Sequence, residues 1–308
     1  MTSFDVRQAI GDGDMEGPRL LVCGRAVTHS GGHLAWCGSV ADGPEEIRKQ
    51  VRILVSDGAD AIKVIASGGS TGGIPTRASY TADELAVAVD AAHALGRATI
   101  AHCRSTDSIA NCLRAGIDVI AHLEFLRPGP IEDLGGGAPT GLPAYDEAVG
   151  EQLAESRPWL DLNPQSSGWD TVVELRERER QTGLSTAEQE NLRGLERYYV
   201  GMLGVISHLR LLGLTDRMAF GTDAGPFDTA FGHPEYNLQL ARLAGLSPIE
   251  SIQVLTRNAA GACGIDDVVG TIRAGMVADL LVLEENPLVD EQAMRSVLAV
   301  FRSGRRVA

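Results

Sequence analysis

Short apolar runs alternate with longer segments of helical periodicity along most of the chain. Six of the apolar runs are candidate β-strands, which begin near Arg19, Ala61, Ala98, Asp118, Trp159 and Arg217. An alternation of strands and helices is typical of a parallel sheet that is covered by helices on both faces. The hydrophobic pattern therefore predicts an α/β protein.

Three of the intervening helices have recognisable starts. A Ser or Thr is followed three residues later by Glu at Thr81 and Glu84, at Ser185 and Glu188, and at Ser247 and Glu250. In such a capping box the hydroxyl accepts a hydrogen bond from the third backbone N–H, and the Glu side chain accepts one from the cap residue. From residue 268 onward, short β-rich runs separated by glycine replace the alternation. This change predicts a small β appendage over residues 268–308.

Four of the candidate strands end on a residue that can hold a metal or move a proton: Lys63, His102, His122 and Asp223. In a (β/α)₈ barrel the active site lies where parallel strands give way to loops, so functional side chains gather at strand ends. The expected fold is therefore a TIM-type (β/α)₈ barrel over residues 1–267.

Composition and charge exclude several classes of function. The chain has 27 Lys and Arg against 41 Asp and Glu, a formal net charge of −14. This charge opposes binding to nucleic acid and to an anionic membrane surface, so a small-molecule substrate is expected. No export signal or run of about 18 apolar residues is visible, and the five cysteines lack Cys-x-x-Cys spacing. A cytoplasmic location is expected. Whether the chain forms a homo-oligomer stays open.

Lys63 lies inside an apolar strand, where burial disfavours the charged ammonium form. A neutral amine can add carbon dioxide to give a carbamate, an oxygen ligand that can bridge two divalent ions. Two alternatives stay open on the sequence alone. The lysine can be salt-bridged within the barrel, or it can form a Schiff base as in an aldolase.

His102 and His122 close successive candidate strands, and neutral imidazole is the commonest protein ligand of zinc-type ions. Either residue alone would be read as a packed core histidine, but together they predict metal ligation. Asp223 can coordinate a metal and accept a proton from metal-bound water, or it can stabilise a turn. His33, after a glycine pair, is expected to contact substrate. His233, on the loop after Asp223, has either that role or one in loop packing.

The chain resembles the amidohydrolase superfamily, in particular its imidazolonepropionase-like and prolidase-like branch. The stretches that carry the resemblance are Ile62-Lys63-Val64 with the Ser-Gly-Gly that follows, the strand ends at His102 and His122, Gly221-Thr222-Asp223, Gly245-Leu246-Ser247-Pro248, Thr256-Arg257-Asn258-Ala259-Ala260, Gly270-Thr271-Ile272, Ala278-Asp279-Leu280 and Asn286-Pro287-Leu288. The resemblance implies a barrel with a flanking β-sandwich and one or two divalent metal ions, zinc above all. It also implies hydrolysis of amide or related C–N bonds by a metal-activated hydroxide.

Individual roles follow from the same resemblance. Lys63 resembles the N6-carboxylated lysine that bridges the metals, and His102 and His122 resemble the ligands of the second metal. Asp223 resembles the catalytic base and a ligand of the first metal. His33 resembles a loop histidine that lines the pocket. Residues 268–308 would then be the C-terminal part of the flanking β-sandwich.

One departure from the family pattern concerns the N-terminus. Members of the family carry a His-x-His pair at the end of the first strand, and this sequence has no such pair. Six candidate strands are visible where a closed barrel has eight. The barrel is therefore expected to be incomplete at its N-terminus. The alternative to a metal-dependent hydrolase is a catalytically impaired or non-catalytic relative that acts as a binding or assembly module.

Overall fold

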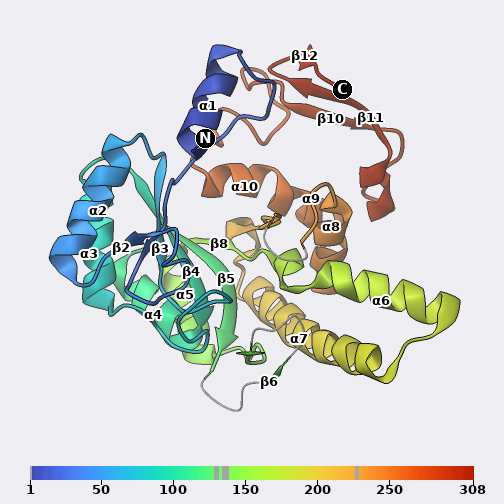
Figure 1. Cartoon of the computed structure of the whole chain (residues 1–308). Helices are drawn as coiled ribbons and strands as arrows, with labels where there is room; N and C mark the ends of the chain where they lie inside the picture. Colours follow the sequence, from blue (N-terminus) through green and yellow to red (C-terminus); the bar gives the residue numbers. More distant parts are fainter. Residues whose placement is uncertain (1, 128–131, 134–138, 226–228) are drawn as a thin grey trace. The chain divides into compact units, whose positions relative to one another are not determined.

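The computed structural model of the chain describes residues 2–127, 132–133, 139–225 and 229–308. Two units divide the chain, and Figure 1 shows the elements of both. The first unit comprises Met1–Pro130 and Asp146–Pro158, and the second comprises Ile131–Tyr145 and Trp159–Ala308. The boundary expected at residue 268 stays a prediction.

A parallel sheet with the strand order β2-β1-β3-β4-β5 forms the centre of the first unit. Its strands are β1 (Val27–Thr28), β2 (Ser39–Val40), β3 (Ala61–Ile65), β4 (Ala98–Ser105) and β5 (Val119–Leu126). The helices of this unit are α1 (Ser3–Asp12), α2 (Pro44–Ser56), α3 (Ala82–His93), α4 (Thr106–Ala115) and α5 (Glu147–Ser156). Figure 1 shows α2, α3 and α4 beside one another along the sheet, and neighbouring helices of this series pack together.

Burial explains why these segments form strands and helices. Every residue of β5 is buried, as expected of a parallel strand covered on both faces, and all its residues except His122 and Glu124 are apolar. In α2 the buried residues are Ile47, Val51 and Leu54, which recur at helical spacing and form one apolar stripe. The stripe faces the unit's core, while the charged residues of the helix stay at the surface.

The strand predicted near Arg19 is wrong. Residues 16–24 have no regular secondary structure, although Val22 is buried. The backbone N–H of Val22 donates to Asp60 Oδ2 at 2.8 Å, and its carbonyl accepts from the Asp60 N–H. The Asp60 side chain thus accepts the hydrogen bond that the Val22 N–H would donate to a neighbouring strand. Pro18 has no backbone N–H and cannot donate a hydrogen bond to a β-ladder. The first strands of the sheet are instead β1 and β2.

The second unit contains the parallel pair β8 (Trp159–Asp161) and β9 (Met218–Ala219), with Leu160 opposite Met218. Its helices are α6 (Trp169–Thr182), α7 (Thr186–Leu211), α8 (Pro234–Leu243), α9 (Pro248–Leu255) and α10 (Arg257–Ala262), with the 3₁₀ turns η1 (Pro164–Ser167), η2 (Thr215–Arg217) and η3 (Glu291–Arg295). A short antiparallel pair joins β6 (Glu132–Asp133) to β7 (Pro139–Thr140).

A three-stranded antiparallel sheet lies near the C-terminus, where the sequence predicts a β appendage. Its order is β10 (Leu280–Leu283), β11 (Val297–Arg302) and β12 (Arg305–Arg306). None of the helices in the described ranges combines the length and the apolar character that crossing a membrane requires.

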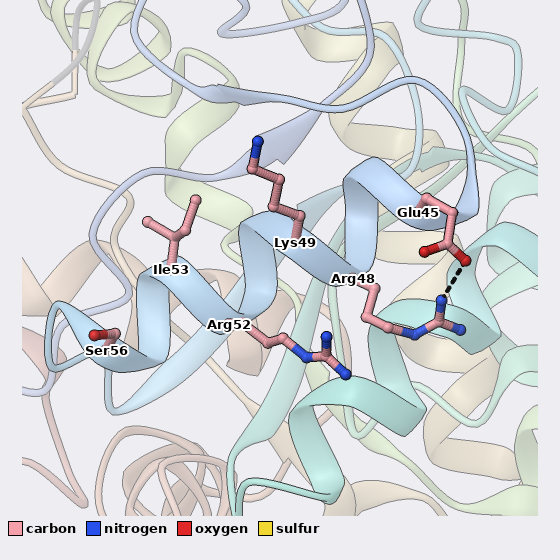
Figure 2. A pocket seen from close by; sticks show the side chains of 6 residues that line it. All are labelled: Glu45, Arg48, Lys49, Arg52, Ile53 and Ser56. Carbon is pink, nitrogen blue, oxygen red and sulfur yellow. Dashed lines mark hydrogen bonds and ion pairs between the residues drawn. The ribbon is translucent and has the colours of Figure 1, made fainter.

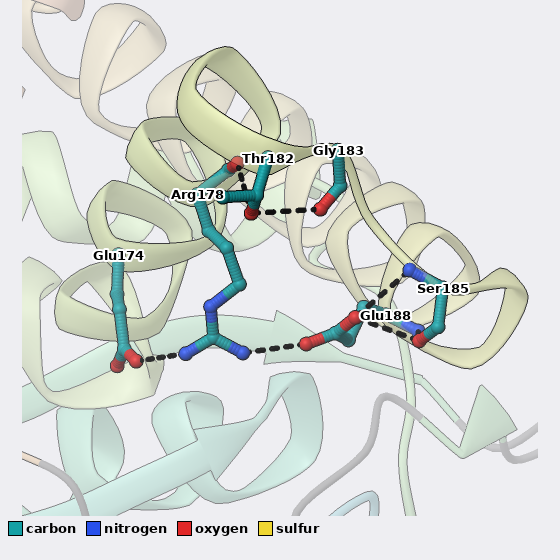
Figure 3. Close-up of polar contacts among 6 residues, drawn as sticks. All are labelled: Glu174, Arg178, Thr182, Gly183, Ser185 and Glu188. Atoms are coloured by element: carbon teal, nitrogen blue, oxygen red, sulfur yellow. Dashed lines mark hydrogen bonds and ion pairs between the residues drawn. The ribbon is translucent and has the colours of Figure 1, made fainter.

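The three predicted capping boxes are confirmed at Thr81, Ser185 and Ser247. The box at Ser185 also joins two helices, as Figure 3 shows. Glu188 accepts hydrogen bonds from the Ser185 hydroxyl and N–H and pairs with Arg178 of α6. These hydrogen bonds and the Arg178 charge lower the pKa of Glu188 to about 2. Glu174 pairs with the other side of the same guanidinium, so Arg178 links α6 to the start of α7.

Candidate metal centre and active site

Three of the histidines predicted from the sequence lie together in the first unit. The ring centroids of His102 and His122 are 4.5 Å apart, and those of His33 and His102 are 4.7 Å apart. His102 comes from β4 and His122 from β5, which pair in parallel, while His33 comes from the turn between β1 and β2. All three side chains are buried. The sheet register therefore brings together residues that are far apart in the sequence.

Burial and nearby positive charges keep these three rings neutral. Burial lowers the pKa of His33 to about 4, and the charges of Arg104 and Lys63 act in the same direction. Burial also lowers the pKa of His102 and His122 well below the usual histidine value. A neutral imidazole keeps a lone pair on one ring nitrogen, which metal coordination requires.

Hydrogen bonds fix which nitrogen of two rings carries the proton. His102 Nε2 lies 3.3 Å from the carbonyl oxygen of Gly68, which can only accept, so Nε2 is the protonated nitrogen. The lone pair of His102 is then on Nδ1. The backbone N–H of Thr71 donates to His33 Nδ1 at 3.3 Å, and Thr71 Oγ1 is 2.7 Å from the same nitrogen. The proton of neutral His33 is therefore on Nε2.

Glycines after β3 allow this loop to approach the histidines. A Cβ atom at Gly68 would lie 2.2 Å from the backbone nitrogen of Ile74, closer than any real contact. A Cβ at Gly69 would lie 2.7 Å from the His33 ring. Only glycine fits at these two positions without a shift of the backbone or of the imidazole. The Ser-Gly-Gly segment is thus required for the Gly68 carbonyl to reach His102.

The carboxyl end of β5 has an uncommon backbone conformation. His122, Leu123 and Phe125 have φ angles of 71°, 50° and 54°, in the left-handed region that residues other than glycine rarely adopt. Such conformations cost on the order of 1–3 kcal/mol each and gather at functional sites. Their presence at His122 favours a functional role for this residue over simple core packing.

Arg104 and Glu124 form an ion pair beside the histidines that was not predicted from the sequence. Arg104 Nε lies 2.9 Å from both carboxylate oxygens of Glu124, and Arg104 Nη2 lies 2.7 Å from Oε2. The side chains are only 14% and 4% exposed. Arg104 follows His102 by two residues on β4, and Glu124 follows His122 by two on β5. Residues two apart share a face of a regular strand, and this spacing was the available signal.

Lys63 lies on β3 opposite Ile100 of β4. It is partly buried, and the residues on either side of it, Ile62 and Val64, are buried completely or nearly so. Its positive charge lowers the pKa of His33, His102 and His122. Lys63 is therefore close enough to the three imidazoles to act on them electrostatically.

The side chains of His102, His122 and Lys63 fit a metal ion on the condition that Lys63 is carboxylated. Within the described ranges, no three His, Cys, Asp or Glu side chains are grouped so that they could hold a metal. His102 and His122 supply two neutral imidazoles, and the lysine amine becomes an oxygen donor only as a carbamate. Two nitrogen ligands and one carbamate oxygen then form a set that suits a zinc-type ion.

Asp223 and His233 belong to the second unit. Asp223 follows β9 with a φ angle of 48°, and the Gly221 N–H before it donates to Asp161 Oδ1 at 3.0 Å. His233 Nδ1 lies 2.9 Å from Glu235 Oε1, and the His233 ring stacks on Tyr236 with the centroids 4.9 Å apart. These contacts give His233 structural partners on α8.

A hollow on the first unit contains none of the predicted residues. Figure 2 shows its lining side chains, which all come from the outer face of α2: Glu45, Arg48, Lys49, Arg52, Ile53 and Ser56. Arg48 is paired with Glu45. The hollow lies between side chains of one charged helix, and we assign it no catalytic role.

Comparisons with known proteins identify the family of this chain. The profile of the Amidohydrolase family matches residues 4–307. The ochratoxinase of Aspergillus niger is 28% identical over 334 aligned residues, which cover 98% of this chain and 62% of the ochratoxinase. The chain thus spans about three-fifths of the length of the curated relatives it matches.

Solved structures show the same fold. A Xaa-Pro dipeptidase with methionine bound in its active site matches with a TM-score of 0.77 at 22% identity, over 98% of this chain and 71% of that chain. A crystal structure described as an amidohydrolase matches with a TM-score of 0.75 at 26% identity, over 99% and 73%. The predicted α/β fold of the TIM-barrel type is confirmed, and the chain belongs to the amidohydrolase family.

Proposed function

We propose that this protein is a metal-dependent amidohydrolase that cleaves the C–N bond of an amide, a peptide-like compound or a cyclic amide. The observation that carries the proposal is the pair of buried, neutral imidazoles of His102 and His122 on the adjacent strands β4 and β5. Family membership supports the class of reaction.

The first unit would bind the metal. His102 coordinates through Nδ1, because its Nε2–H is directed to the Gly68 carbonyl. His122 supplies the second nitrogen, and Lys63 supplies an oxygen as its N6-carboxylated form. When bound, a divalent ion such as zinc would activate water and polarise the substrate carbonyl.

We assign the proton transfers of the proposed reaction to the carboxylate of Asp223. Its carboxylate accepts a proton from the attacking water as the new C–O bond forms. The same proton passes to the leaving nitrogen as the C–N bond breaks, so the products are a carboxylic acid and an amine. His33 and His233 are proposed to contact the substrate, His33 through its Nε2–H.

The names of the relatives indicate the first substrates to test. One relative is called an ochratoxinase and another a Xaa-Pro dipeptidase. A first panel therefore contains ochratoxin and Xaa-Pro dipeptides, extended by acyl-amino acids and cyclic amides. We expect the protein to hydrolyse a member of this panel.

The test combines metal analysis with product detection. Purified protein should carry one or two divalent ions per chain by plasma mass spectrometry and release an amine from a panel member. The double variant His102→Ala with His122→Ala should lose both metal and turnover. His93→Ala, which removes a histidine paired with Asp118 away from the site, is the matched control and should keep both.

Two outcomes would contradict the proposal. If the double variant keeps the full metal content, His102 and His122 are not ligands. If the wild-type protein binds no metal and cleaves no panel member, a non-catalytic binding module is the better description. Lys63→Ala should also lose metal and regain some activity when a short-chain carboxylate and bicarbonate are added.

A further inference from the structure

The Thr71 side chain joins two loops of the first unit at the His33 ring. The backbone N–H of Leu34 donates to Thr71 Oγ1 at 2.9 Å, and the same oxygen lies 2.7 Å from His33 Nδ1. Because the Thr71 N–H also donates to Nδ1, at 3.3 Å, this nitrogen is an acceptor and the hydroxyl proton points to it. Two donors of one residue therefore hold the same imidazole nitrogen.

A tight turn in the loop after β3 brings Thr71 to this position. Gly69 and Gly72 pair across the turn, with N–H to carbonyl distances of 3.0 and 3.4 Å. A Cβ atom at Gly72 would lie 2.5 Å from the carbonyl oxygen of Gly32, the residue before His33. Any side chain at position 72 would thus push the turn away, and glycine lets the two loops meet.

The main chain of His33 is fixed as well. Thr28 at the end of β1 donates its hydroxyl to the His33 carbonyl at 2.9 Å, and Thr28 is completely buried. The His33 side chain is also buried, with its ring 4.7 Å from that of His102. Since Thr71 holds Nδ1, neither the main chain nor the ring of His33 can turn without the loss of a hydrogen bond.

Nε2 is the nitrogen through which His33 can act. It carries the proton of the neutral ring, and among the described residues it has no hydrogen-bond partner. It is not one of the enclosed polar atoms that lack a partner, so a ligand can reach it. An oxygen acceptor satisfies such an N–H, whereas an ammonium group, which has only donors, does not.

We propose that Thr71 is a positioning residue for the reaction: it holds His33 by Nδ1, so that the Nε2–H donates to a carbonyl or carboxylate oxygen of the substrate. The inference rests on the proposed function, because it gives Thr71 a role in that reaction. The active group is the Thr71 hydroxyl, and Thr71 itself does not contact the substrate.

The first test needs neither metal nor substrate. Nuclear magnetic resonance of metal-free protein with nitrogen-15-labelled histidine, at about pH 7, distinguishes protonated from unprotonated ring nitrogens. The His33 signals are those that disappear in His33→Asn. In the wild type Nε2 should be protonated, and Nδ1 should be unprotonated and hydrogen-bonded. In Thr71→Val, which keeps the shape without the hydroxyl, the Nδ1 resonance should move toward that of a nitrogen without a hydrogen bond.

Matched variants separate positioning from simple loop stability. Thr71→Ser keeps the hydroxyl and should keep the wild-type Nδ1 resonance. Ser70→Ala changes the neighbouring residue in the same turn and should also leave it unchanged. A purely structural effect would lower the melting temperature without moving this resonance. Thr71→Ala carries the same expectation as Thr71→Val, which provides a test even if the valine variant does not fold.

The second test is kinetic and uses a panel member that the wild-type protein hydrolyses. In Thr71→Val, kcat/KM should fall by about 3–10-fold, the size expected when one neutral hydrogen bond is lost. Thr71→Ser should restore it.

An Nδ1 resonance that does not move in either Thr71→Val or Thr71→Ala would overturn the proposal. A resonance that moves while kcat/KM is unchanged would overturn the role of Thr71 in the reaction. Failure of the proposed function is recognised separately, because the wild-type protein would then cleave no panel member, whatever the Nδ1 resonance shows. The positioning role would be overturned with it.

Discussion

Arg104 and Glu124 form a buried ion pair two residues beyond His102 and His122 on the adjacent strands β4 and β5. The pair places a fixed positive charge near three neutral imidazoles and a negative charge beside it. A buried ion pair is sensitive to the loss of one partner, because the remaining charge is then buried without compensation.

Glu124→Gln should destabilise the fold strongly. The substitution keeps the size of the side chain but leaves the Arg104 guanidinium without its counter-charge. We expect the free energy of unfolding in urea to fall by about 3–5 kcal/mol. The double variant Arg104→Met with Glu124→Leu removes both charges and should recover most of this loss. A loss below about 1 kcal/mol in Glu124→Gln would show that the pair behaves as an exposed one.

The metal-free protein should lose stability as the pH falls from about 6.5 toward 4. The pKa of His33 is lowered to about 4 in the fold, whereas an unfolded histidine titrates near 6.5. The unfolded chain therefore binds protons that the folded chain excludes, and stability is lost on acidification. Each such proton contributes a slope of about 1.4 kcal/mol per pH unit. The midpoints of urea unfolding, measured at several pH values in the presence of a chelator, give this slope.

His33→Asn separates this effect from the titration of carboxylates. The variant lacks one group that the fold holds neutral, so its stability should depend less steeply on pH between about 4 and 6.5. His93→Asn, which removes a half-exposed histidine paired with Asp118, is the matched control. Equal slopes in wild type and His33→Asn would contradict the assigned protonation state.

Gly68→Ala should weaken metal binding without removing a ligand. The new Cβ would clash with the backbone at Ile74, so the loop must move and the Gly68 carbonyl leaves His102 Nε2. Loss of a partner that orients a metal ligand typically lowers metal affinity about 10–100-fold. Competition with a chromogenic chelator measures the affinity. Gly11→Ala, at a helical position with open space around it, should leave the affinity unchanged.

Asp223→Asn should keep the metal and lose turnover. The amide cannot accept the proton of the attacking water, so kcat for a substrate of the wild-type protein should fall by about 10²–10⁴-fold. Asp267→Asn, at an exposed position, is the control and should retain normal kcat. A rate near that of the wild type in Asp223→Asn would remove this residue from the mechanism.

Local patterns predicted the positions of several strands and the helix starts, but not where the strands end. The strands that carry Lys63, His102 and His122 were predicted because each contains a short apolar run. The expectation that strands end at His102 and His122 is wrong, because β4 continues to Ser105 and β5 to Leu126. The Thr81 cap was predicted because it depends on residues only three apart. Cys103 follows His102 on β4, and its Sγ lies 3.2 Å from that of Cys112 in α4.

Features that depend on three-dimensional contacts were not predictable in the same way. The segment near Arg19 has the composition of a strand, but the Asp60 side chain takes the hydrogen bond of Val22. The left-handed backbone at His122 has no signature in an apolar run. Spacing relates Arg104 to His102 and Glu124 to His122, but the pairing of Arg104 with Glu124 depends on the register of β4 and β5, which shifts between Cys103 and Ser105.

The first unit is assembled from two separate stretches of chain, because α5 returns to it after an excursion into the second unit. Helix α5 packs against α4, and Leu153 within it is completely buried. A gene fragment that stops at residue 130 would therefore lack α5 and expose the surface of α4 on which α5 packs. To express the first unit alone, residues 146–158 must be joined to residues 1–130 by a linker, because no single break in the chain separates the two units.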